Sequence, residues 1–201
     1  YSAAASDDGR TVPTTSSDGT VRFWDLLSGR GAPLGRRETG PVYRLAFGPI
    51  KGQFALNAWD QQLEIWQLEP PKLLDQFNVQ GDLVAGQISY DGRFVLENNN
   101  GALRVVEVHA KSFVQSWDVP PTQVGAFHPA QPLLLIAAGE TLSLLEIPSG
   151  RVVSQTPIVS EALRVGFDDT GLEAYAHLSN GMISVFGVPE LTSKLTTAGS
   201  N

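Results

Sequence analysis

The sequence predicts an all-β fold built from a repeated unit of about forty residues. One strand pattern occurs five times, and its fourth residues are Trp24, Trp66, Val106, Leu145 and Phe186. The steps between these residues are 42, 40, 39 and 41 positions. A constant period of this length, with several short strands in each unit, predicts sheets that stack on one another, because one small sheet cannot bury both of its faces.

Each unit is expected to contain four strands. The third strand is the repeated pattern itself, at Val21–Leu26, Leu63–Leu68, Leu103–Val108, Leu142–Ile147 and Ile183–Val188. The first strand ends in a turn, at Val42–Pro49, Val84–Gly92, Gln123–Pro129 and Leu163–Gly171, with a truncated copy at Tyr1–Gly9. The second strand follows, at Thr11–Thr15, Gln53–Ala58, Phe94–Glu97, Leu133–Ala137 and Leu172–Leu178. Alternating apolar residues within these segments, and Gly, Asp, Asn and Pro between them, indicate strands joined by turns.

We call the five recurring strand residues, Trp24, Trp66, Val106, Leu145 and Phe186, the marker residues. A turn residue lies six positions before each of them. These residues are Asp18, Asp60, Asn100, Gly139 and Asn180. Asp and Asn side chains accept hydrogen bonds from nearby backbone and tolerate tight-turn geometry. The pattern therefore predicts a hairpin between the second and third strands of each unit.

The segment SSDGTVRFWD resembles the end of a WD40 repeat, with Trp24 and Asp25 as its Trp-Asp dipeptide. The resemblance implies a β-propeller of four-stranded antiparallel blades. In that family an Asp, a His, a Ser or Thr, and the Trp form a hydrogen-bonded network within a blade. Asp18 and Asp60 match the Asp, while Trp24 and Trp66 match the Trp, which we expect to be buried. No histidine matches, so the network is expected to be incomplete.

The number of repeats raises a question about the ring. About five blades are visible, whereas propellers of this family usually close with seven or eight, or about 280–340 residues at this period. We expect a propeller over residues 1–190, with repeats at roughly 1–40, 41–80, 81–120, 121–160 and 161–197, and a candidate last strand and tail over 191–201. The chain could be part of a larger ring, a closed five-blade ring, or a ring completed by another chain. We favour the first, because an open ring exposes sheet faces.

Composition excludes several classes of protein. The net charge of −7 disfavours nonspecific nucleic-acid binding, so no nucleic acid is expected as a partner. The absence of cysteine excludes disulfides and thiolate sites. No apolar run approaches the ~20 residues of a membrane span, and no signal peptide is visible. We expect a soluble protein of unknown compartment, with the cytoplasm favoured.

No residue pattern indicates catalysis, a metal or a cofactor. His109, His128 and His177 fall at different places in their units and lack metal-ligand spacing, and His128 is expected to have a role in a turn. Asp7–Asp8 and Asp168–Asp169 occupy the same turn of two units, which indicates backbone capping rather than an acid–base pair. Phosphate-loop and nucleophile-elbow motifs are absent. We therefore expect no enzyme activity.

The resemblance implies a non-catalytic scaffold for protein–protein interaction, as a fragment or subunit of a larger protein or complex. Partners would bind a rim that includes Tyr43, Trp59, Asn99 and Glu161. An exposed Tyr and Trp would form a hot spot, although both rings could instead pack between blades. The alternative is a propeller enzyme, or a propeller that binds a small ligand or sugar in its central channel. A purely structural subunit also remains open.

Overall fold

The computed structural model describes residues 6, 9–36, 42–47, 52–58, 62–68, 72–78, 82–99, 102–107, 112–118 and 124–188. The chain divides into two compact units. Unit 1 comprises Tyr1–Asn99 and Glu107–Ser112, and unit 2 comprises Asn100–Val106 and Phe113–Asn201. We describe each unit by itself.

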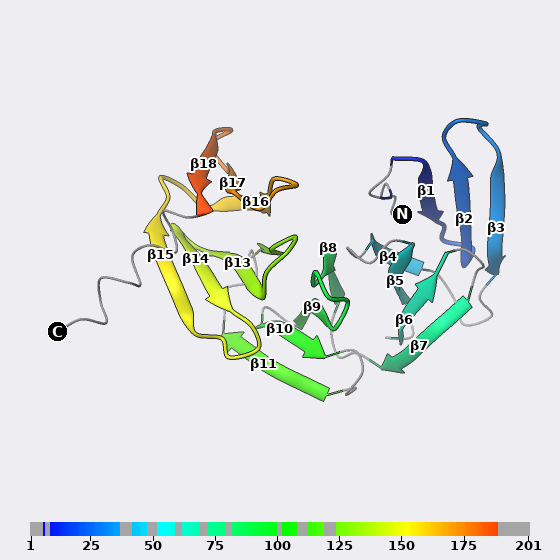
Figure 1. Cartoon of the computed structure of the whole chain (residues 1–201), viewed down its shortest axis with the longest axis horizontal. Coiled ribbons are helices and arrows are strands. Elements are labelled where there is room, and N and C mark those ends of the chain that lie inside the picture. Colours follow the sequence, from blue (N-terminus) through cyan, green and yellow to red (C-terminus); the bar gives the residue numbers. More distant parts are fainter. Residues whose placement is uncertain are drawn as a thin grey trace. The chain divides into compact units, whose positions relative to one another are not determined.

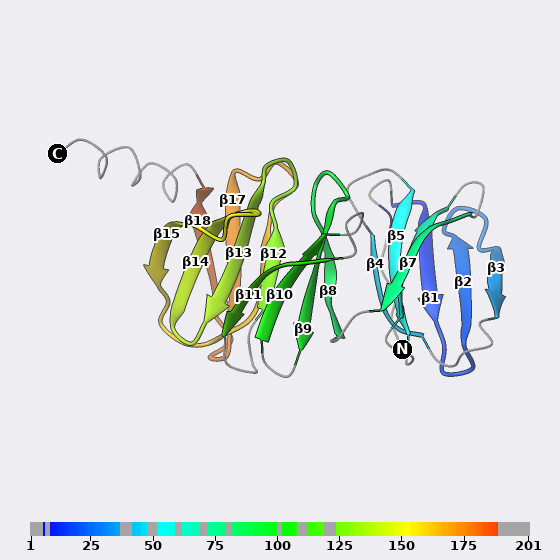
Figure 2. The ribbon, with the colours of Figure 1, turned by 90° about the horizontal axis from the view of Figure 1, so that it is seen from below.

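Unit 1 contains one three-stranded sheet, one four-stranded sheet and a further antiparallel pair of strands (Figure 1). Its strands are β1 (Thr11–Thr15), β2 (Thr20–Asp25), β3 (Gly31–Arg36), β4 (Val42–Phe47), β5 (Gln53–Ala58), β6 (Gln62–Gln67), β7 (Lys72–Asn78), β8 (Asp82–Ile88) and β9 (Phe94–Asn99). The sheet orders are β1-β2-β3 and β4-β5-β6-β7, so strands that follow in sequence lie side by side (Figure 2).

Unit 2 follows the same plan. Its strands are β12 (Val124–Phe127), β13 (Leu133–Ala138), β14 (Thr141–Glu146), β15 (Val152–Pro157), β16 (Ala162–Phe167), β17 (Glu173–Leu178) and β18 (Ile183–Gly187), and β10 (Ala102–Glu107) and β11 (Ser112–Asp118) fall mainly in this unit. The sheet orders are β12-β13-β14-β15 and β16-β17-β18, and all neighbouring strands in them are antiparallel.

The all-β, propeller-like fold expected from the sequence is confirmed. The second strands expected at Thr11–Thr15 and Gln53–Ala58 match β1 and β5 residue for residue. All five third strands begin within one residue of their expected positions. The alternation of apolar residues was therefore sufficient to locate these strands.

One backbone hydrogen bond recurs in four of the sheets and shows that they are copies of one unit. In each case, the residue after the third strand donates its N–H to a carbonyl in the turn before the second strand. The pairs are Leu26 to Arg10 at 2.8 Å, Leu68 to Gly52 at 2.7 Å, Ile147 to Pro132 at 2.8 Å and Val188 to Leu172 at 2.8 Å. The repeat in sequence is thus also a repeat in backbone geometry.

Aromatic packing joins the sheets β1–β3 and β4–β7 of unit 1. Phe23 of β2 contacts Phe54 of β5 edge-on, with 5.2 Å between ring centroids. Phe54 in turn stacks on Trp66 of β6 at 6.4 Å. Val21 and Leu56 complete this core and are buried. The apolar face of β1–β3 therefore covers the Trp66 face of the next sheet in sequence.

The core of unit 2 forms in the same way between β12–β15 and β16–β18. One face of β12–β15 contributes Leu135, Ala137, Leu142 and Leu144, which are all buried. The facing sheet contributes small and aliphatic side chains, together with the partly buried aromatics packed against the core, namely Ala162, Val165, Phe167, Ala174, Ala176, Leu178 and Phe186. Small residues on one sheet let the leucines of the other approach closely.

Candidate functional site

The structure describes the expected partner-binding residues unequally. Tyr43 lies in β4 and Asn99 ends β9, but their side chains lie outside the described residues, as do Trp59 and the turn residue Asp60. Glu161 is fully described, and it lies half-buried between β15 and β16 of unit 2. The candidate site is therefore built around Glu161.

Backbone hydrogen bonds fix the β15–β16 connection to two hairpin turns. At its start, Ile158 donates its N–H to the carbonyl of Glu140, in the β13–β14 turn, at 2.9 Å. At its end, the carbonyl of Glu161 accepts the N–H of Ser179, in the β17–β18 turn, at 2.8 Å. The connection and both turns therefore lie at the same end of the strands of unit 2, as expected for a rim made by successive antiparallel hairpins.

The two hairpin turns have defined geometry. Gly139 and Gly181 take left-handed φ angles of 55° and 84°. Met182 donates its N–H to the Asn180 side-chain oxygen at 3.0 Å. Asn180 thus forms the local backbone bond that its sequence position predicts. Such turns present side chains without the ordering cost of a free loop.

We call Glu140, Val159, Glu161 and Met182 the rim site. Val159 is 70% exposed, and Met182 is also exposed. The carboxylates of Glu140 and Glu161 give the site acidic character next to its two apolar side chains. Apolar side chains held in solvent by a fixed backbone are suited to burial against a protein partner.

Sequence reasoning missed Val159 and Met182. Both are large apolar residues in connections between strands, at residues 158–161 and 179–182. This mismatch was the available signal, because turn residues are usually polar or small. The recurring strand pattern drew attention to the aromatic residues instead.

A second feature joins equivalent turns of the two sheets of unit 2, and its backbone pattern also occurs in unit 1. Ser6, Ser89, His128 and Asp168 each donate their N–H to the carbonyl five residues ahead, at 2.9–3.0 Å. Asp168 accepts the N–H of Glu173 at 2.8 Å, and its carboxylate also accepts the Thr170 hydroxyl. These bonds lower the pKa of Asp168. The capping role expected for Asp168 is therefore confirmed, and Asp7–Asp8 lie outside the described residues.

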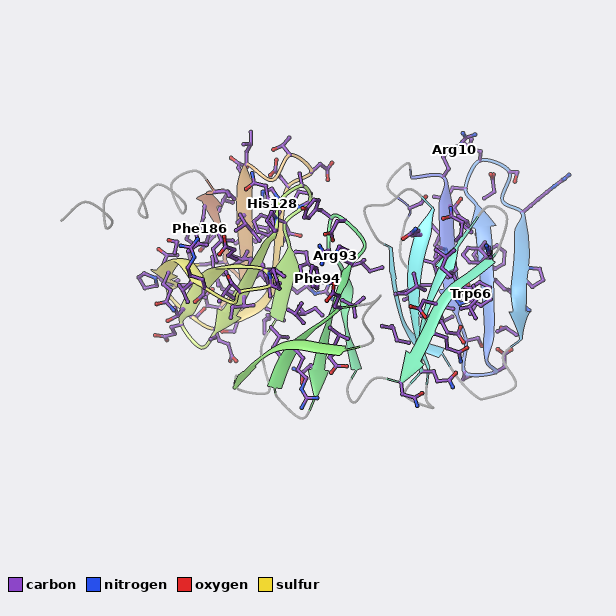
Figure 3. All side chains as sticks on the ribbon, turned by 60° about the horizontal axis from the view of Figure 1, so that its bottom comes forward. Arg10, Trp66, Arg93, Phe94, His128 and Phe186 are labelled. Carbon is purple, nitrogen blue, oxygen red and sulfur yellow. The ribbon has the colours of Figure 1, made fainter. Side chains whose placement is uncertain are left out.

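His128 occupies the same turn position but also reaches the next repeat. Its Nδ1 accepts the N–H of Ala130 at 3.0 Å, and its Nε2 lies 3.1 Å from the carbonyl oxygen of Gly171. The ring of His128 is buried within unit 2 (Figure 3). Its centroid lies 5.0 Å from that of the Phe167 ring. Because Nδ1 accepts, Nε2 must carry the proton that is donated to Gly171. The turn role expected for His128 is confirmed, and it extends between sheets.

The described part of the chain offers little for metal chemistry. Within these residues, no group of three His, Cys, Asp or Glu side chains could hold a metal ion. Both ring nitrogens of His128 are occupied by backbone groups. Among the described residues there is also no helix long and apolar enough to cross a membrane.

Comparison with known proteins supports the resemblance seen in the repeats. The chain is 27% identical over 90 residues to periodic tryptophan protein 2 of Arabidopsis thaliana, a match that covers 45% of this chain and 10% of that protein. It is 31% identical over 111 residues to WD repeat-containing protein 90 of Homo sapiens, which covers 54% of this chain and 6% of that protein. Over about half of its length, this chain is therefore similar to WD-repeat proteins. No family model matches it. The chain spans a tenth or less of the length of these relatives.

The first repeat keeps part of the hydrogen-bonded network that the family resemblance implies. The Trp24 Nε1–H donates to the Thr14 hydroxyl at 2.9 Å, which is the Trp-to-Thr bond that the family resemblance implies. The Asp18 carboxylate accepts the hydroxyl of Thr20 at 2.6 Å and its N–H at 2.9 Å. These two bonds lower the pKa of Asp18 to about 2. Trp24 is 36% exposed, so the expectation that it is buried is wrong. Gly31 of β3 lies against the ring, since a Cβ at that residue would be 2.8 Å from ring carbons of Trp24.

The second repeat replaces the bond to a threonine hydroxyl with a bond to a carboxylate. The Trp66 Nε1–H donates to the carboxylate of Glu64 at 2.8 Å. Glu64 is buried on the same sheet face as Trp66, two residues away along β6.

In the first repeat, Asp25 of the Trp-Asp dipeptide accepts the N–H of Ser28 at 2.7 Å, which lowers the pKa of Asp25 and closes the turn after β2.

Proposed function

We propose that this chain is a non-catalytic protein-interaction module and that the rim site of unit 2 contacts its partners. The observation that carries the proposal is the exposure of Val159 between backbone hydrogen bonds that start at Ile158 and end at Glu161. An aliphatic side chain in that position stabilises no part of the described fold. Its burial against a partner would release ordered water and contribute to binding.

Tyr43, Trp59 and Asn99 remain proposed contacts of unit 1. By sequence, Tyr43 lies at the start of a first strand, and Trp59 and Asn99 lie where second strands lead into third strands. The relatives support an interaction role, because WD-repeat proteins are typically scaffolds. The small share of each relative that the chain covers supports the proposal that it works as part of a larger protein or complex.

Comparison of bound proteins tests the role of the rim. Wild-type chain, a Val159→Arg variant and a Leu172→Arg variant would be immobilised, and the proteins that each retains would be quantified by mass spectrometry. Leu172 is the matched control, because it is also exposed but lies in the β16–β17 turn, at the opposite end of the strands from the rim site.

We expect the rim variant to lose at least one specific partner by tenfold or more, since a hot-spot side chain contributes about 2 kcal/mol or more and 1.4 kcal/mol corresponds to tenfold. The control should retain it. Equal retention by all three proteins, each with an unchanged melting temperature, would exclude the rim site.

A further inference from the structure

The rim site contains the single sulfur atom of the sequence. The chain has one methionine, Met182, and no cysteine. The Met182 side chain is 54% exposed. An exposed thioether reacts with peroxides to give methionine sulfoxide, and this sequence has no thiol that would compete for the oxidant. Oxidation of sulfur in this chain therefore occurs at one position, which lies in the proposed interaction surface.

The β17–β18 hairpin places Met182 at the end of the core of unit 2. The N–H of Leu178 donates to the carbonyl of Met182 at 2.8 Å, which continues the ladder beyond the pair of His177 and Ile183. Residues directly opposite each other in an antiparallel ladder lie on the same face. Leu178 is buried against β12–β15, so Met182 extends that apolar face to its solvent-exposed end.

The hairpin holds the Met182 backbone without using its sulfur. Gly181 donates its N–H to the carbonyl of Leu178 at 3.0 Å, and Met182 donates its N–H to the Asn180 side-chain oxygen at 3.0 Å. A Cβ on Gly181 would meet nothing within 4 Å, so the turn is open on that side. Oxidation of the sulfur leaves these bonds intact. It would therefore change the surface of the rim site and not the fold of the hairpin.

The other side chains of the rim site are unsuited to a sulfoxide. The carboxylates of Glu140 and Glu161 only accept hydrogen bonds, and Val159 neither donates nor accepts them. The sulfoxide oxygen is itself an acceptor, so the rim site offers it no side-chain donor. A partner that buries Met182 as an apolar contact would have to bury this oxygen without a hydrogen bond, which is costly.

We propose that Met182 is a site of reversible oxidation that controls binding at the rim site. The oxidant is a peroxide, and with hydrogen peroxide the Met182 sulfur attacks one peroxide oxygen while the O–O bond breaks. The transferred oxygen gives its proton to the hydroxide that leaves, which forms water. The sulfur loses two electrons and the peroxide gains them. The effect on binding rests on the proposed function, whereas the oxidation itself does not.

Nuclear magnetic resonance of the methionine methyl group tests the oxidation. The chain would be isotope-labelled at this group, and the initiating methionine would be removed, so that Met182 gives the single methyl signal. We expect hydrogen peroxide to replace this signal with that of the sulfoxide at a rate close to that of N-acetylmethionine, with an unchanged melting temperature. A rate lower by about fivefold or more would overturn the proposal, because reactivity follows exposure.

A binding comparison tests the control of the rim site. The probe is the partner that the Val159→Arg variant loses. Wild type and Met182→Leu would be treated with peroxide, freed of it and then mixed with this partner. Leucine is similar in size to methionine and has no sulfur to oxidise. We expect treatment to weaken binding by wild type about tenfold and to leave Met182→Leu unchanged, and we expect methionine sulfoxide reductase to restore the loss.

The outcomes separate this inference from the proposed function. Full binding by oxidised wild type, or an equal loss in Met182→Leu, would overturn the control by Met182 while the rim site remains an interaction surface. If Val159→Arg loses no partner, the proposed function fails and the control of binding fails with it. The methyl signal reports the oxidation of Met182 in either case.

Discussion

The Nε2 of His128 lies 3.1 Å from the carbonyl oxygen of Gly171, which joins the first turn of one repeat to the same turn of the next. The two residues are 43 positions apart in sequence. Other repeats place Ser6, Ser89 or Asp168 at the position of His128. Their side-chain oxygens accept the N–H of the residue five positions ahead, namely Thr11, Phe94 and Glu173. His128 thus links the two sheets of unit 2 at a polar point beside their apolar core.

The close approach at Gly171 predicts a large effect of Gly171→Ala. Gly171 has a φ of +72°, and an added Cβ would lie 2.3 Å from Cε1 of His128. We expect a loss of about 2–5 kcal/mol in the free energy of unfolding, from about 1–2 for the left-handed backbone and about 1–3 for overpacking. Urea unfolding monitored by circular dichroism measures it.

Gly181→Ala is the matched control for this substitution. Its φ is +84°, but an added Cβ meets nothing within 4 Å. We therefore expect a loss of only about 1–2 kcal/mol, the backbone part alone. If both alanine variants lose the same free energy of unfolding, the close approach of the His128 ring to position 171 does not affect stability.

The burial of His128 predicts that stability depends on pH. Burial lowers the pKa of His128 below its ordinary value of 6.5, and the bond to Gly171 and the charge of Asp168 offset this only in part. The unfolded chain therefore binds more protons than the folded chain between the folded-state pKa and 6.5. The contribution of His128 is present above pH 6.5 and is lost as the pH falls through this window.

Urea unfolding at pH 7.5 and pH 5.5 measures this dependence. We expect the free energy of unfolding to fall more steeply in wild type than in His128→Gln, because the variant lacks the titrating ring. His109 and His177 are common to both proteins and cancel in the comparison. Parallel pH profiles would show that His128 is not protonated on unfolding.

The marker tryptophans should respond differently to removal of the indole N–H. We expect Trp24→Phe to reduce the free energy of unfolding by about 0.5–1.5 kcal/mol, the usual range for a neutral hydrogen bond such as that to Thr14. Trp66→Phe should reduce it by about 1.5–3 kcal/mol, because Trp66 donates to the buried carboxylate of Glu64. Denaturant unfolding of both variants measures the difference. A larger loss for Trp24→Phe would contradict the exposure of that ring.

The sequence predicted most of the strands but not the contacts between sheets. Alternation located β1 and β5 to the residue, since side chains on a strand point to opposite faces with a period of two. It could not show that His128 reaches Gly171, because that contact depends on how one repeat packs on the next. The exposure of Trp24 was missed for the same reason.

The candidate site was predicted less well than the fold. Glu161 was placed on the rim by its position between repeats, and the structure places it next to the β17–β18 turn through Ser179. Val159 was missed because the sequence does not distinguish it from the neighbouring Ile158, which is buried. What makes it a candidate is its exposure, which requires the fold of its neighbours to be known.

Hydrogen–deuterium exchange of the chain, alone and bound to a protein partner recovered with it, tests the central claim most directly. The account predicts protection on binding in residues 158–161 and 179–182, with the β16–β17 turn unchanged. Protection confined to other segments, or no protection at the rim site, would contradict the claim that the rim site of unit 2 is the interaction surface.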